Sequence, residues 1–180
     1  MYREREKLKA ILRENSILRG SYKLSSGKES NYYIDARLTT LHPEGIYLVG
    51  KIFLDVIRKD SEIQAVGGLT MGADPIVGSI ISQSYQQGCP IRGFLVRKEE
   101  KQHGTEKLIE GSIKSGDKVA IVEDVSTTGG SILKAIEAVR SSGASVKKVL
   151  VIVDRDEGAR KVFEDMGYEF YSAFRIGELL

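Results

Sequence analysis

Apolar residues along this chain follow two alternating patterns, which are short continuous runs and stripes at helical spacing. The runs are rich in Val, Ile and Leu, which is typical of strands buried on both faces of a parallel sheet. They predict strands at residues 65–69, 91–97, 118–125, 146–154 and 168–174. The stripes recur every three or four residues, as on the buried face of an amphipathic helix. They predict helices at residues 3–14, 43–57, 75–85, 131–143 and 158–167.

The order of these elements determines the expected fold class. Strands that alternate with helices form right-handed βαβ units around a mostly parallel sheet. We therefore expect a single α/β domain over residues 1–180, built on an open sheet of about five strands flanked by helices. The first forty or so residues lack this rhythm. We expect residues 1–42 to form a small cap and residues 43–180 to form the core.

Composition and charge narrow the class of protein. The net charge of +2 is too small to favour non-specific binding of nucleic acid. No apolar run approaches the roughly 20 residues that span a bilayer, and the charged start MYREREKLKA lacks the apolar segment of a signal peptide. The lone Cys89 excludes an intramolecular disulfide and a multi-cysteine metal site. We therefore expect a reduced, cytoplasmic protein without nucleic-acid or membrane partners.

The stretch IVEDVSTTGGSILKAI, residues 121–136, combines two acids with a turn suited to an anion. Gly129 and Gly130 let the backbone approach a ligand closely, and the amides at the start of the following helix attract negative charge. Hydroxyl donors flank the glycines at Thr127, Thr128 and Ser131. Phosphate is the expected ligand, although the Walker pattern G-x-x-x-x-G-K-[ST] is absent.

The acids Glu123 and Asp124 would repel a phosphate unless they face another part of the ligand. Vicinal sugar hydroxyls are suitable partners, because a carboxylate accepts hydrogen bonds from both. A sugar phosphate therefore satisfies both halves of the stretch. The alternative is a plain strand-to-helix turn, in which acids and glycines are also common.

The same stretch resembles the phosphoribosyl pyrophosphate (PRPP) motif of type I phosphoribosyltransferases, in which two acids and T-T-G-G-S follow an apolar strand. Residues 96–111 (VRKEEKQHGTEKLIEG), residues 153–159 (VDRDEGA) and the N-terminal LSSGKESNYYIDAR resemble orotate phosphoribosyltransferases within that superfamily. The resemblance implies the type I phosphoribosyltransferase fold. It also implies a PRPP site formed by Glu123, Asp124, Val125, Ser126, Thr127, Thr128, Gly129, Gly130 and Ser131.

Cationic side chains gather in RKEEKQHG, between two predicted strands. Taken alone, this segment reads as a solvated loop in which Glu99 and Glu100 nearly balance the cations. The resemblance instead implies a mobile loop, residues 97–107, that closes over the pyrophosphate in a neighbouring subunit's site, and hence a homodimer. The family pattern is matched at Arg97, Lys98, Lys101 and His103.

Arg155 follows the strand that ends in VIVD. An arginine fork suits the planar carboxylate of orotate, and the resemblance implies that Arg155 and Thr127 contact orotate. The alternative is a surface arginine paired with Asp154 or Asp156. The resemblance also implies a pyrophosphate-binding turn at Thr70-Met71-Gly72-Ala73, which lacks the lysine that some members carry there. The cap likewise has Ser25 where some members have lysine, so Lys23 and Lys28 are the candidate replacements; His42 reads as a capping or surface residue.

The resemblance implies transfer of ribose 5-phosphate from PRPP to orotate, with Mg2+ held mainly by PRPP and not directly by protein ligands. Lys101, His103 and Asp124 are the expected catalytic residues. A purine or uracil phosphoribosyltransferase would share the PRPP turn but lack the RKEEKQHG and VDRDEGA segments. A non-catalytic regulator on the same scaffold would need a basic face or a DNA-binding domain, and neither is visible.

Overall fold

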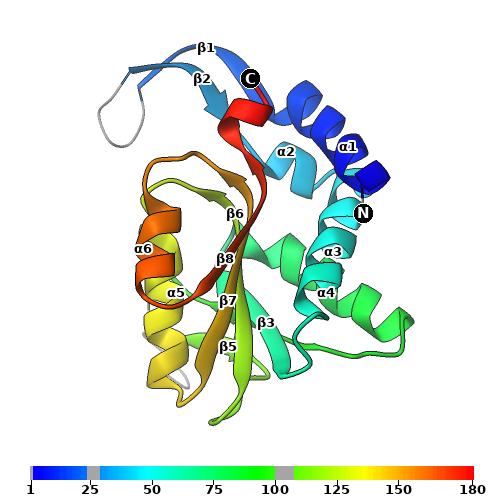
Figure 1. Ribbon diagram of the computed structural model, residues 1–180, viewed down its shortest axis with the longest axis vertical. Helices are drawn as coiled ribbons and strands as arrows, with labels where there is room; N and C mark the ends of the chain where they lie inside the picture. Colours follow the sequence, from blue (N-terminus) through cyan, green and yellow to red (C-terminus); the bar gives the residue numbers. More distant parts are fainter. Residues whose placement is uncertain (1, 24–28, 100–107) are drawn as a thin grey trace.

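The computed structural model describes residues 2–23, 29–99 and 108–180, and its centre is a six-stranded sheet (Figure 1). The strand order is β5-β4-β3-β6-β7-β8, and every neighbouring pair is parallel except β4 and β5. The strands are β3 (Ile63–Leu69), β4 (Arg92–Val96), β5 (Ile109–Gly111), β6 (Lys118–Ser126), β7 (Ser145–Asp154) and β8 (Glu169–Arg175). The predicted fold class is confirmed, with one strand more than the five expected, because β5 is too short to produce an apolar run.

Helices cover both faces of this sheet, which explains its continuous apolar strands. Figure 1 shows α3 (Pro43–Ile57) and α4 (Ala73–Gln86) on one side, and α5 (Gly130–Ser141) and α6 (Ala159–Asp165) on the other. Neighbouring residues of β7 alternate between the two apolar cores, with Leu150 in the first and Val151 in the second. Both side chains are fully buried. A strand that contributes to two cores needs an apolar residue at every position.

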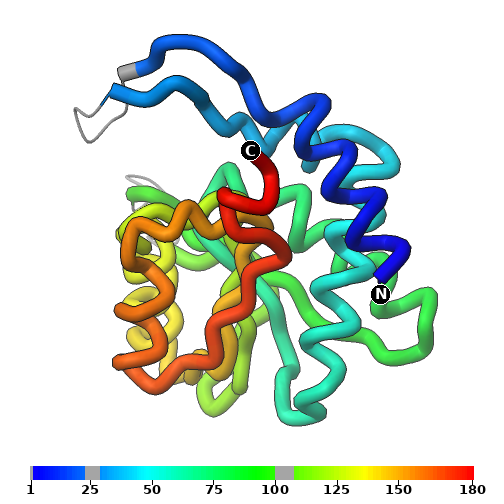
Figure 2. Tube along the Cα trace, turned by 45° about the horizontal axis from the view of Figure 1, so that its top comes forward, coloured from blue at the N-terminus to red at the C-terminus, as the bar shows by residue number. Residues whose placement is uncertain are grey.

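The N-terminal segment packs onto the core at one end and projects from it at the other. It consists of α1 (Tyr2–Ile11), a π-helical turn (Leu12–Ser16), the antiparallel hairpin β1 (Ile17–Lys23) and β2 (Glu29–Ile34), and α2 (Arg37–Thr40). Leu8 and Leu12 are fully buried in the same core as α3 and α4. Figures 1 and 2 show the hairpin beyond the end of the sheet where the β6–α5 and β7–α6 turns lie.

The start of α3 illustrates how local sequence sets an element boundary. Pro43 occupies the first turn, where its missing N–H costs nothing. Nδ1 of His42 accepts a hydrogen bond from the Gly45 N–H at 3.2 Å. The reading of His42 as a capping residue is therefore confirmed.

Candidate active site

The turn between β6 and α5 lies at the carboxyl end of the sheet, where open α/β folds bind ligands. Gly129 has φ +89° and caps α5, a backbone conformation that residues with a Cβ rarely adopt. A Cβ there would also lie 2.7 Å from the Phe163 ring. Thr128, Gly130 and Ser131 are exposed around it. The helix therefore presents its first amides to solvent beside hydroxyl donors, as the anion-binding prediction requires.

Backbone hydrogen bonds join this turn to the β7–α6 turn. The Arg155 N–H donates to the Ser126 carbonyl at 2.9 Å, and the Ala159 N–H donates to the Thr127 carbonyl at 3.2 Å. The two loops therefore form one rigid edge, with Arg155 beside the predicted phosphate turn.

The acids Glu123 and Asp124 have different environments although they are adjacent. The Glu123 side chain is buried, and burial, followed by the nearby charge of Asp124, raises the pKa of Glu123 to about 8. Asp124 is half-buried, and its Oδ1 accepts a hydrogen bond from the Val125 N–H at 2.7 Å. One carboxyl is therefore largely protonated at neutral pH while the site retains a second acid beside it.

The turn after β3 approaches these acids closely. A Cβ on Gly72 would lie 2.5 Å from Oε1 of Glu123 and 2.9 Å from Oδ1 of Asp124. Only glycine fits without displacing a carboxylate. The predicted pyrophosphate turn and the predicted ribose acids therefore face one another.

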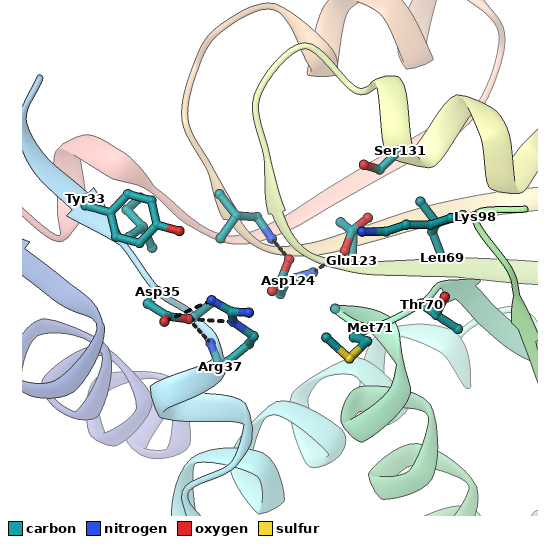
Figure 3. A pocket seen from close by; sticks show the side chains of 14 residues that line it. Tyr33, Asp35, Arg37, Leu69, Thr70, Met71, Lys98, Glu123, Asp124 and Ser131 are labelled. Atoms are coloured by element: carbon teal, nitrogen blue, oxygen red, sulfur yellow. Dashed lines mark hydrogen bonds and ion pairs between the residues drawn. The ribbon is translucent and has the colours of Figure 1, made fainter. Parts of the chain in front are cut away.

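A pocket of about 350 Å³ opens between these segments (Figure 3). Its walls come from the end of β2 and the start of α2, from the turn after β3, from Lys98 two residues beyond β4, and from the β6–α5 segment. The lining side chains used below are Tyr33, Asp35, Arg37, Thr70, Met71, Lys98, Glu123, Asp124, Val125 and Ser131.

The predicted cationic segment is divided between different environments. Lys98 lines the pocket. Arg97 does not line it, because its Nη2 pairs with Oε1 of Glu110 at 2.9 Å across the β4–β5 ladder. Lys101 and His103 lie outside the described residues, as do Ser25 and Lys28 and the side chain of Lys23.

Arg155 has a more specific environment than a surface arginine. Its guanidinium lies over the Tyr32 ring at 5.3 Å, and its Nε is 3.0 Å from Oε1 of Glu157. The alternative partners are bound elsewhere: Asp154 is 3.4 Å from Arg160, and Asp156 is 3.7 Å from Arg175. Pairing of Arg155 with Asp154 or Asp156 is therefore not what the structure shows. Stacking on Tyr32 links Arg155 to the N-terminal hairpin.

The chain matches the phosphoribosyl transferase domain family over residues 39–172. It is 46% identical to the orotate phosphoribosyltransferase of Aquifex aeolicus over 180 residues, covering 98% of each chain, and 43% identical to that of Rhodopseudomonas palustris, covering 98% of this chain and 96% of the relative. The chain belongs to the orotate phosphoribosyltransferase family. The resemblance inferred from the motifs is confirmed.

Solved structures of orotate phosphoribosyltransferases agree with this assignment. The Mycobacterium tuberculosis protein in complex with Fe(III) dicitrate has a TM-score of 0.87 at 40% identity, and its complex with PRPP has a TM-score of 0.82 at 38% identity. Both comparisons cover 98% of each chain. An adenine phosphoribosyltransferase from Leishmania tarentolae, with a TM-score of 0.66 at 17% identity, shares the fold alone.

Asp35 and Arg37 line the pocket but were not among the predicted site residues of this orotate phosphoribosyltransferase family member. They stand at the end of the segment LSSGKESNYYIDAR. They follow the apolar end of β2, and the alternation Ile34-Asp35-Ala36-Arg37 is the sequence signal that marks them. Both aliphatic residues of this stretch are buried, whereas the charged ones are accessible. Nothing in that local pattern indicates which distant turn the charged pair faces.

The described residues offer neither a membrane-spanning helix nor a ready-made metal cluster. No helix among the described residues is long and apolar enough to cross a membrane. Within residues 2–23, 29–99 and 108–180, no cluster of three or more His, Cys, Asp and Glu side chains has the arrangement of a metal site.

Proposed function

We propose that this protein transfers the ribose 5-phosphate group of PRPP to orotate, giving orotidine 5'-monophosphate and pyrophosphate. The observation that carries this proposal is the pocket in which the acids Glu123 and Asp124 face the turn at Gly72, next to the anion-binding start of α5. PRPP carries a phosphate, a diol and a pyrophosphate in that order along one molecule. The pocket and its rim offer complementary groups for all three.

The binding roles follow from the chemistry of each segment. The 5-phosphate binds the turn of residues 126–131 through backbone amides and hydroxyl groups. The ribose hydroxyls bind the two acids, where protonated Glu123 donates and Asp124 accepts. Arg155 and Thr127 contact orotate, and the stacking of Arg155 on Tyr32 orients its guanidinium for that purpose.

Transfer requires no covalent bond to the protein. The bond between ribose C1 and the pyrophosphate oxygen breaks with its electron pair leaving on pyrophosphate, while the orotate ring nitrogen supplies the pair for the new bond to C1. The proton of that nitrogen is released to the departing pyrophosphate. Asp124 stabilises the positive charge that develops on the ribose. Lys98 offers a cation to the leaving pyrophosphate, and Lys101 and His103 are proposed to add further charge. Positioning and electrostatics together account for catalysis.

Mg2+ is the proposed cofactor. PRPP would hold the ion mainly through its own phosphate and hydroxyl oxygens, which are the hard donors that Mg2+ prefers, and the Asp124 carboxylate lies in the same pocket. When bound, the ion neutralises part of the pyrophosphate charge. A site that is completed by the substrate needs no closed protein cage.

The protein is further proposed to act as a cytoplasmic homodimer in which the loop of residues 97–107 carries Lys101 and His103 to the other subunit's pocket, while Lys98 near its start lines the pocket of its own subunit. An apolar groove of about 720 Å³ adjoins the active-site pocket and shares Asp35, Arg37 and Met71 with it. Its rim exposes Leu41 at 74% and Met71 at 67%. Side chains of this kind are buried in subunit interfaces, and a partner seated there lies next to the active site.

A base-specificity assay tests the proposed reaction. Purified protein with PRPP and Mg2+ is expected to consume orotate but not uracil, hypoxanthine or adenine, with pyrophosphate release as the second readout. The Asp124→Asn variant serves as the inactive control. Turnover of a purine or of uracil in place of orotate would contradict the proposed reaction and indicate another phosphoribosyltransferase class.

A further inference from the structure

The turn after β3 faces a ligand that carries several negative charges, yet it offers no cation of its own. Its pocket-lining residues are Thr70, Met71 and Gly72, and the Met71 side chain is 67% exposed. Backbone amides and one hydroxyl leave most of a pyrophosphate's charge unbalanced. Donor groups from other segments are therefore required at this end of the pocket, in addition to the Mg2+ that PRPP brings.

Arg37 is the side chain that meets this requirement. Among the described lining residues of the pocket, only Arg37 and Lys98 are cationic, and they come from opposite walls. Figure 3 shows Arg37 between Asp35 and Met71, on the side of the pocket that faces the turn after β3. We propose that Arg37 binds the pyrophosphate group of PRPP through the N–H donors that its pairing with Asp35 leaves free, which supplements the donors of the turn after β3. This assignment rests on the proposed PRPP-dependent function.

The guanidinium is held in place before any ligand arrives. Its Nε donates to Oδ1 of Asp35 at 2.9 Å and its Nη2 donates to Oδ2 at 3.1 Å. The Arg37 N–H donates to the same carboxylate at 3.2 Å. These bonds hold the pKa of the Asp35 carboxyl below its usual range, so Asp35 stays ionised and the pair stays formed at neutral pH.

The N–H donors of Arg37 that do not bind Asp35 suit a phosphate. Two of the five N–H donors of the guanidinium bind Asp35, and the others remain for an anion. Arginine binds phosphate oxygens through two parallel hydrogen bonds, which a lysine ammonium does not reproduce. The side chain is 51% exposed, so a ligand reaches it without rearrangement of the pocket.

The electrostatic setting favours a cation here. The nearby charge of Asp124 contributes to raising the pKa of Arg37, after the larger effects of Asp35. Arg37 and the ribose acids line the same pocket, so they can contact two parts of one ligand. A pyrophosphate between Arg37 and Lys98 has cations on both sides, while the sugar lies against the acids.

Direct binding measurements test the assignment without any nucleobase. Titration calorimetry with Mg2+ compares pyrophosphate, PRPP and ribose 5-phosphate on the wild type, Arg37→Gln and Arg37→Lys. Loss of the Arg37 guanidinium should weaken the binding of pyrophosphate and PRPP about 10- to 100-fold and leave the affinity for ribose 5-phosphate unchanged. Arg37→Lys keeps the charge but loses the fork, so its affinity for pyrophosphate should be intermediate.

Arg58→Gln is the matched control, because Arg58 is an exposed arginine at the end of α3 that donates to Gln87 outside the pocket. It should bind all three ligands like the wild type. Sedimentation and thermal melts check that each variant keeps its oligomeric state and fold. If Arg37→Gln does not fold, the pyrophosphate affinity of Arg37→Lys decides the question.

Unchanged pyrophosphate affinity in a folded Arg37 variant overturns the assignment, and so does an equal loss for ribose 5-phosphate, which indicates a purely structural role. These readouts do not involve orotate. A wild-type protein that binds PRPP but does not turn over orotate therefore contradicts the proposed function and leaves the Arg37 result readable.

Discussion

The close approach of Gly72 to the two acids makes Gly72→Ala a sharp perturbation of the site. Gly72 has φ −61° and ψ −41°, which alanine adopts freely. Replacing glycine by alanine lowers the conformational entropy of the unfolded chain. This effect by itself would stabilise the protein by about 0.4–1 kcal/mol. The added methyl group instead meets Oε1 of Glu123 at 2.5 Å, so that oxygen must move by about 0.9 Å to reach an ordinary contact of 3.4 Å.

A shift of this size decides the expected phenotype. Misplacing a reacting group by about 1 Å costs on the order of 100-fold in rate. We therefore expect Gly72→Ala to lower kcat/KM for PRPP by roughly 10- to 100-fold, with a free energy of unfolding within about 1–2 kcal/mol of the wild type. Orotate consumption and urea unfolding measure the two quantities.

Gly78→Ala is the matched control for this experiment. Gly78 lies inside α4, and a Cβ there meets nothing within 4 Å. The substitution should raise stability by about 0.5–1 kcal/mol and leave turnover unchanged. Wild-type turnover by folded Gly72→Ala would refute the idea that the glycine is required to position the acids.

Three further predictions concern the proposed site and its supporting turn. Because the pKa of Glu123 is raised to about 8, the folded state binds more protons than the unfolded state between pH 4.5 and 8. The free energy of unfolding of the wild type, measured in urea, should therefore fall as pH rises through that window, and Glu123→Gln should remove this dependence. The same pH dependence in Glu123→Gln as in the wild type would contradict the raised pKa of Glu123. Gly129→Ala combines positive φ with an overlap on Phe163, so it should cost about 2–4 kcal/mol in a thermal melt. Inactive Lys101→Ala and Asp124→Asn subunits should regain activity when mixed, because one whole site is restored; no recovery despite confirmed subunit exchange argues against shared sites.

The spacing of apolar residues is sufficient to predict the core strands and helices of this protein. The apolar runs of β6 and β7 and the apolar stripe of α5 identified these elements directly. A strand buried on both faces gives a continuous apolar run, whereas a helix buried on one face gives an apolar residue every three or four positions. The chemistry of residues 123–131 was also readable locally, since two acids and a glycine turn lie within nine consecutive positions. Three-residue β5 and four-residue α2 were missed, because neither is long enough to show a period.

What the sequence by itself determined was therefore the α/β class, the anion-binding turn and the pair of acids, all of which depend on neighbours in the chain. Only the tertiary structure decided that Gly72 contacts those acids, that Arg155 stacks on Tyr32, and that Arg37 enters the pocket. Gly72 is 51 positions from Glu123, and Tyr32 is 123 positions from Arg155. The physical reason is that parallel strands bring their carboxyl ends together at one edge of the sheet, whereas sequence spacing alone carries no record of which turns meet there.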